Sequence, residues 1–203
     1  MKRTAEQLKC VIIDYLLQTY PNTIIGNEVM FGSTRNAVDL LAIHNSKIIA
    51  IEIKSKDDNL KRLPNQIEEY SKVYDKIIIF CSDDKIDTTK KIIKDTPIGL
   101  FSISGSIIRR INVPHVNKST NKEEMLASIP ASYLKKVFKL KGKINSDEVR
   151  QLLSKKSKKQ IHEQLLNFYK EKLTVSFKQY IEDKGENSVI DDLPILSKES
   201  QII

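Results

Sequence analysis

The amino-acid sequence predicts an α/β protein in which a central mixed β-sheet is flanked by helices and followed by a basic helical segment. Over residues 1–113, short apolar or alternating runs of strand length alternate with amphipathic helical runs. From Lys122 onward the strand patterns stop and only helical periodicity remains. The length of 203 residues suits one compact domain with room for a small appendage.

The composition is that of an ordinary globular protein, with 40% hydrophobic and 30% charged residues. No apolar run approaches the roughly 18 residues that a membrane-spanning helix needs. The N-terminus lacks the apolar core of a signal peptide, so we expect a cytoplasmic protein. Cys10 and Cys81 lie among apolar residues and are expected to be buried thiols.

A helix and three strands are predicted for the N-terminal quarter of the chain. Thr4 and Gln7 have the spacing of a capping box, which begins a helix that runs to about Thr19, before Pro21. The short connection His44-Asn45-Ser46 makes a hairpin of the second and third strands. The three strands are expected over 23–31, 36–43 and 47–54.

The next elements alternate between helices and strands. Pro64 suits the first turn of a helix that extends over 66–74. A near-continuous apolar run over 76–81 fits a strand buried on both faces. A second crossover helix is expected over 86–94, a further strand over 98–103, and an edge strand or an extended arm over 106–113.

Three helices are predicted for the C-terminal part, over 129–139, 146–153 and 157–180, and an acidic tail is expected to be frayed. We therefore divide the chain into a core (1–117), a basic helical segment (122–182) and an acidic tail (183–203).

The net charge of +8 is concentrated in one stretch of the chain. Residues 134–180 contain 13 Lys and Arg against 4 Asp and Glu, a net charge of +9. A polyanionic partner is one explanation, and a set of solvated lysine-rich helix faces is the other.

Charged residues interrupt the apolar strands of the predicted hairpin. Because side chains alternate along a strand, Glu52 and Lys54 project from the same face as Ile48 and Ala50. Burying such charges costs several kcal/mol per ion on order-of-magnitude grounds, which suggests that they have a use. A turn centred near Asn45 places Asp39 opposite position 51, on the rung next to Glu52.

Paired carboxylates beside a lysine suit one kind of chemistry. Mg²⁺ (or Mn²⁺) is commonly bound by one or two carboxylates together with substrate phosphate. Such an ion activates water and neutralises charge at phosphorus, while a lysine can hold the water or stabilise negative charge. This combination hydrolyses phosphodiesters.

The set Asp39 and Glu52-Ile53-Lys54 resembles the PD-(D/E)XK motif of restriction-endonuclease-like nucleases, with Val38 in place of the proline. Gln66-x-x-x-Tyr70 is similar to the helix motif of the exonuclease-type branch of that superfamily. The wider pattern through Asp58, Arg62 and Val73-Tyr74-Asp75 resembles a family of small bacterial and phage proteins within it. This likeness extends over about residues 5–113.

The resemblance implies a restriction-endonuclease-like core and a role for each matching residue. Asp39 and Glu52 would bind the metal together with the Ile53 carbonyl, and Lys54 would position the water. Glu28 matches an accessory acidic ligand, although a strand-edge position or a salt bridge would also explain it. Gln66 and Tyr70 share a helix face that would look toward the site, and Tyr70 by itself also fits the core.

Nucleic-acid contacts are expected from basic residues near the motif and in the helical segment. Base-reading side chains are not identifiable, so no sequence specificity is predicted. The candidates are Arg35, Arg62, Lys135, Lys136, Lys139, Lys141, Lys143, Arg150, Lys155, Lys156, Lys158 and Lys159.

The sequence therefore predicts a bacterial or phage Mg²⁺-dependent deoxyribonuclease, with DNA preferred to RNA as its partner and a homodimer possible. One alternative is a non-catalytic DNA-binding module that retains the nuclease fold. A second alternative is a protein–protein adaptor whose lysines confer solubility.

Overall fold

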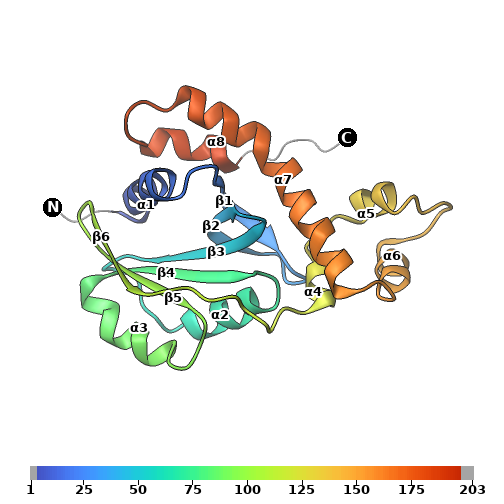
Figure 1. The fold of residues 1–203 in the computed structure, drawn as a ribbon, viewed down its shortest axis with the longest axis horizontal. Coiled ribbons are helices and arrows are strands. Elements are labelled where there is room, and N and C mark those ends of the chain that lie inside the picture. Colours follow the sequence, from blue (N-terminus) through green and yellow to red (C-terminus); the bar gives the residue numbers. More distant parts are fainter. Residues whose placement is uncertain (1–3, 198–203) are drawn as a thin grey trace.

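The computed structural model describes residues 4–197, and within them the strands form one six-stranded mixed sheet. The strands lie side by side in chain order, from β1 to β6. The pairs β3–β4 and β4–β5 are parallel and the other pairs are antiparallel. Helices cover both faces of the sheet (Figure 1), so the predicted α/β class is confirmed. The elements are α1 (Ala5–Thr19), β1 (Ile24–Phe31), β2 (Asn36–His44), β3 (Lys47–Lys54), α2 (Leu63–Ser71), β4 (Lys76–Ser82), η1 (Asp83–Lys85), α3 (Ile86–Ile92), β5 (Gly99–Ser104), β6 (Ile107–Asn112), α4 (Lys122–Ala127), α5 (Ala131–Val137), α6 (Ser146–Leu153), α7 (Lys158–Asp183), η2 (Ile190–Asp192) and α8 (Leu193–Ser197).

Local sequence signals explain where several helices begin. The Thr4–Gln7 capping box is present at the start of α1. Asn145 and Ser157 cap α6 and α7 in the same way. The parallel pairs are joined through α2 and α3, as a parallel connection requires a crossover.

The hairpin between β2 and β3 differs from the prediction by one residue. The turn contains two residues, Asn45 and Ser46, and both have left-handed φ angles (47° and 58°). This is the geometry of a two-residue hairpin turn, and it pairs His44 with Lys47. Leu40 therefore faces Ile51, where the prediction placed Asp39 opposite position 51, and this pair is the last of the ladder.

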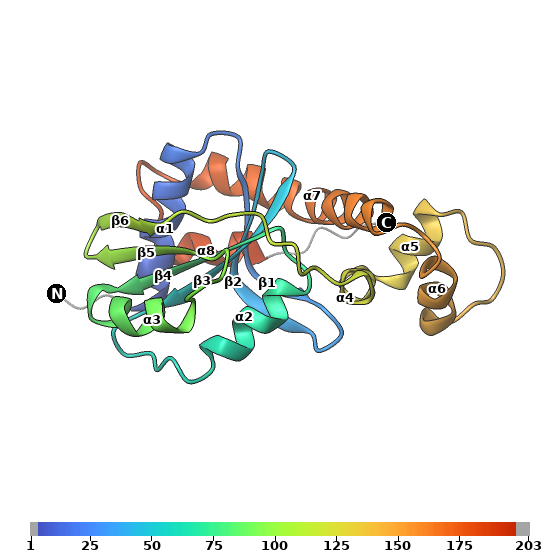
Figure 2. The same cartoon turned by 60° about the horizontal axis from the view of Figure 1, so that its bottom comes forward.

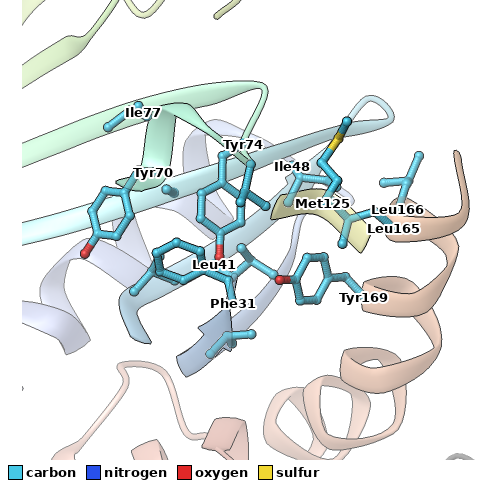
Figure 3. Packing of buried hydrophobic residues seen from close by; sticks show 14 of the residues in the cluster. Phe31, Leu41, Ile48, Tyr70, Tyr74, Ile77, Met125, Leu165, Leu166 and Tyr169 are labelled. Atoms are coloured by element: carbon cyan, nitrogen blue, oxygen red, sulfur yellow. The ribbon is translucent and has the colours of Figure 1, made fainter. Parts of the chain in front are cut away.

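The core consists of two hydrophobic clusters, one on each face of the sheet. Ile48 and Ala50 of β3 belong to the first cluster, which α2 and α7 cover. Ile51 and Ile53 belong to the second, which α1 and α8 cover. The predicted alternation of β3 is confirmed. Figure 3 shows aromatic rings of β1, α2 and α7 meeting in the first cluster.

Helix α7 contributes to the same core as the sheet. Leu173 lies so close to β1 that a Cβ added to Gly26 would be 2.6 Å from its Cδ2 atom. The expectation of a frayed acidic tail is wrong for residues 190–197. Leu193 and Leu196, three residues apart on α8, are buried in the second cluster. Burial of these two leucines on one side of α8 fixes the segment, although the tail as a whole is polar and acidic.

The helix predicted over 129–139 is present as the shorter α5, and α4 precedes it over residues for which no helix was predicted. Pro130 separates them, because proline provides no backbone N–H for a continuous helix. Helices α5 and α6 lie beyond α4, on the opposite side of the molecule from β5 and β6 (Figures 1 and 2).

Candidate active site

The site begins at a corner in the β1–β2 hairpin. Glu28 has a left-handed φ of 52°, a conformation that costs a non-glycine residue roughly 1–3 kcal/mol. Before it, Ile25 belongs to the second cluster, whereas after it Val29 and Phe31 belong to the first. The hairpin thus changes face at Glu28 and at Asp39, which lies across from it in the β1–β2 register.

Asp39 is fixed at this corner by a main-chain contact. The ladder between β2 and β3 ends at the pair Leu40–Ile51. Beyond that pair, the Asp39 carboxylate accepts a hydrogen bond from the Ile53 N–H at 2.7 Å. The Asp39 side chain therefore takes the place of a main-chain acceptor for the Ile53 N–H, beyond the point where β2 stops pairing with β3. The contact holds Asp39 next to the Glu52-Ile53-Lys54 segment.

Glu52 is the centre of a closed polar network. Its side chain is 2% exposed, and its Oε1 atom accepts hydrogen bonds from Lys54 Nζ at 2.6 Å and from Gln66 Nε2 at 2.7 Å. The Tyr70 hydroxyl donates to Glu52 Oε2, and Lys54 Nζ also donates to Gln66 Oε1 at 2.9 Å. The structure thus brings together four of the residues that the sequence motifs predict.

Helix α2 presents Gln66 and Tyr70 to this network because they are one turn apart. Pro64 lies in the first turn of the helix, as predicted. The Tyr70 ring packs against Phe31 and Tyr74 (Figure 3), while its hydroxyl contacts Glu52. The two interpretations of Tyr70, as a core residue and as a site residue, are therefore both correct for different parts of the side chain.

Burial and like charge perturb the ionisable groups of the site. Desolvation is the main cause that raises the pKa of Asp39 to about 6, and the nearby negative charge of Glu52 adds to it. The positive charges of Lys9 and Lys54 act in the opposite direction. Burial and the adjacent Glu52 raise the pKa of Tyr70 strongly, so its hydroxyl stays a neutral donor at physiological pH.

An open groove of about 410 Å³ gives access to the network. It runs between the end of the hairpin and α2, and Asp39, Gln66 and Tyr70 line it together with Arg62. Arg62 is exposed and is thus placed where a ligand in the groove would meet it. Arg35 is exposed on the hairpin turn and is not among the groove-lining residues.

Glu28 is not part of the Glu52 network. Its carboxylate is 63% exposed and forms an ion pair of 2.8 Å with Lys9 Nζ on α1. A salt bridge, one of the two alternative explanations for Glu28, is therefore the contact observed. Sequence reasoning missed Lys9, although a signal exists. The lysine shares a helix face with the buried Ile13 and Leu16, which is an unusual position for a charge.

The carboxylates of the site offer donors of the type that Mg²⁺ uses. Over residues 4–197, no three His, Cys, Asp or Glu side chains converge as a metal site. Asp39 and Glu52 provide two carboxylates on adjacent strands, and Glu52 uses three of its about four acceptor positions. Two carboxylates with substrate phosphate and water form a usual Mg²⁺ environment, so the donor chemistry fits.

The basic segment is mostly exposed, and part of it has structural contacts. Lys135 donates to the Ile144 carbonyl and Lys158 to the Thr120 carbonyl. Arg150 donates to the Ser146 carbonyl at 3.2 Å, and Lys156 lies 5.8 Å from the centre of the Phe138 ring. The remaining predicted contact residues are exposed on α5, at the start of α7 and in the connections before and after α6: Lys136, Lys139, Lys141, Lys143, Lys155 and Lys159.

Comparison with known proteins finds similarity to a bacteriophage protein. The model of the family described as Bacteriophage P4 protein cII matches residues 1–197. Protein cII of Enterobacteria phage P4 is 27% identical over 205 residues, covering 95% of this chain and 77% of the relative. A solved structure of a protein of unknown function from Silicibacter pomeroyi aligns with a TM-score of 0.40 and 14% identity, covering 86% of this chain and 90% of that one. Between residues 4 and 197, none of the helices is both long enough and apolar enough to cross a membrane.

Proposed function

The chain belongs to the bacteriophage P4 protein cII family, and we propose that it is a divalent-cation-dependent nuclease with a restriction-endonuclease-like core that hydrolyses phosphodiester bonds in DNA. The observation that carries this proposal is the buried Glu52–Lys54 ion pair, held by Gln66 and Tyr70 beside Asp39 and a groove. A protein seldom buries such a pair for stability, because desolvation of the two charges offsets most of their attraction.

Each residue of the network has a distinct task in this proposal. The Lys54 ammonium, held by Glu52 and Gln66, donates to the attacking water and stabilises negative charge on the phosphate. Tyr70 and Gln66 act as positioning residues that fix the Glu52 carboxylate. Arg62, at the groove wall, holds the phosphodiester by charge.

Asp39, Glu52 and the Ile53 carbonyl would hold Mg²⁺ or Mn²⁺. When bound, such an ion supplies positive charge that lowers the barrier to attack on the phosphodiester. Burial is the main cause of the raised pKa of Asp39, and the negative charge of Glu52 adds to it. A cation between the two carboxylates would relieve that second contribution, which supports this role.

The exposed lysines on and around α5 and α6 support DNA as the partner. A polyanion that lies across the groove needs a surface that holds it beyond the reacting phosphate. Phosphate contacts by these lysines would make the affinity fall steeply as the salt concentration rises. Such contacts provide affinity without reading the base sequence.

The test is a cleavage assay on supercoiled plasmid and single-stranded DNA, with Mg²⁺ or Mn²⁺ and with EDTA. We expect cleavage by the wild-type chain to require the cation. Glu52→Ala and Lys54→Ala should each reduce it by at least about 100-fold, a typical effect of losing a charged group that acts on the transition state. Lys90→Met on the surface of α3 is the control and should cleave normally. Unchanged cleavage by the two site variants would rule out the assignment.

A DNA-binding module without turnover is the second candidate. It is favoured by the fact that Lys54 already compensates the Glu52 charge, so that the network is closed without an ion. This candidate predicts salt-dependent DNA binding that EDTA does not change and no cleavage with either cation.

A further inference from the structure

We infer that the Lys9 ammonium takes the place of a second cation at this site, so that the site binds a single divalent ion. This inference rests on the proposed function and assigns a role to a residue outside the sequence motifs. Its starting point is the 2.8 Å contact between Lys9 Nζ and Glu28 Oε1 at the hairpin corner.

Lys9 is buried in a way that needs an explanation. Its side chain is 8% exposed and extends from α1, whose inner face packs in the second cluster. Removing an ammonium group from water costs several kcal/mol unless negative groups surround it. Glu28 is one such group, and Asp39 lies across from Glu28 in the strand register. Lys9 therefore approaches these acidic residues from the face of the sheet that α1 covers, whereas Lys54 lies on the face that α2 covers.

The surroundings of Lys9 are rich in oxygen acceptors. A hollow of about 340 Å³ between α1, β1 and α8 is lined by Glu6, Lys9, Asn27 and Glu28 among others. The Asn27 side chain is buried, and among the described residues its Oδ1 atom accepts no hydrogen bond. Carboxylate and amide oxygens are donors for a hard cation. In the wild type, the Lys9 ammonium is the cation among these oxygens. Without it, the same oxygens would be available to an ion.

The formal charges lead to the same conclusion. Glu28, Asp39 and Glu52 contribute three negative charges, and Lys9 and Lys54 contribute two positive ones. One divalent ion changes the balance of these groups from −1 to +1, which matches one phosphodiester charge. A second divalent ion would leave an excess of positive charge. Without the Lys9 charge the balance would be −2, so one divalent ion would give 0 and two would give +2, compared with +3 for two ions when Lys9 is present.

The test counts bound ions rather than activity. Mn²⁺ is titrated into the full chain without DNA, and the free ion is measured by its electron paramagnetic resonance signal. We expect one Mn²⁺ per chain for the wild type and two for Lys9→Met, with Lys9→Arg remaining at one. Lys172→Met is the matched control, because Lys172 is also a buried lysine (8% exposed as a residue, against 6% for Lys9) but lies on α7 over the Phe168 ring. It should bind one ion.

Glu28→Gln provides a second measurement that does not depend on the folding of Lys9→Met. If Glu28 is the counter-ion of Lys9, this variant should bind one Mn²⁺ with a dissociation constant within about threefold of the wild type. A loss of tenfold or more would make Glu28 a ligand and would overturn the inference.

The two proposals fail in different ways. One ion in both the wild type and a folded Lys9→Met, or two ions in the wild type, would overturn the role of Lys9 alone. No Mn²⁺ bound by the wild type would refute the cation-dependent function and the inference together.

Discussion

Lys54→Met tests whether the Glu52 network is an enclosed ion pair. The variant keeps the aliphatic stem of the side chain but leaves the Glu52 carboxylate, 2% exposed, with only neutral donors from Gln66 and Tyr70. Breaking a buried pair by removing one partner costs about 3–5 kcal/mol, because the remaining charge is uncompensated. For a chain of this size each kcal/mol lowers the melting temperature by about 2–4 °C, so we expect a loss of roughly 6–20 °C.

The double variant Glu52→Gln/Lys54→Met separates the loss of the pair from the loss of packing. Removing both charges also removes the uncompensated group, so the double variant should be more stable than Lys54→Met by about 1–4 kcal/mol. The measurement is urea denaturation at equilibrium in EDTA, followed by circular dichroism, with Lys90→Met as the exposed-lysine control. A loss below about 1 kcal/mol in Lys54→Met would mean that water reaches the pair and that the two charges are not enclosed.

Three further predictions concern other parts of the molecule. Tyr70→Phe removes one hydrogen-bond donor to Glu52 and should lower the free energy of unfolding, measured in urea, by about 1–3 kcal/mol. Its loss of cleavage should be smaller than that of Lys54→Ala. Stability equal to that of the wild type would show that the hydroxyl contact is not formed. Although burial raises the pKa of Asp75, hydrogen bonds from His162 Nε2 at 2.9 Å and from the Ile48 N–H at 2.8 Å lower it below its usual value. Asp75 therefore stabilises the fold above pH about 4, and this contribution is lost as the pH falls below that value, so Asp75→Asn should flatten the acid side of a plot of stability against pH; an equally steep acid limb in the variant would exclude this role. Replacing Lys139, Lys141 and Lys143 by Gln should reduce the slope of log K against log salt concentration for binding of duplex DNA. The reduction should be up to about 0.9 for each phosphate that the variant no longer neutralises, measured by fluorescence anisotropy. An unchanged slope would show that the DNA does not contact these three lysines.

Local patterns predict much of the fold and of the Glu52 network. The E-x-K spacing places two charges on one face of β3, and the four-residue spacing of Gln66 and Tyr70 places both on one face of α2. Each of these placements follows from the side-chain periodicity of a single strand or helix. The meeting of the two elements follows from the motif resemblance rather than from periodicity.

The features that sequence reasoning missed depend on contacts between distant elements. Lys9 and Glu28 are 19 residues apart, and their contact requires α1 to cross the hairpin corner. The strand register depends on whether the turn has two or three residues, which left-handed φ angles at Asn45 and Ser46 decide. Helix α8 forms because Leu193 and Leu196 find a hydrophobic surface that other parts of the chain create.

The contact of α7 with the edge strand has a consequence for synthesis on the ribosome. β1 is at the edge of the sheet, and Leu173 of α7 covers it at Gly26. A nascent chain that has not yet exposed residue 173 leaves the apolar face of β1 at Gly26 uncovered. The first cluster, to which α7 contributes Leu165, Tyr169 and Leu173, is therefore complete only after these residues have been translated.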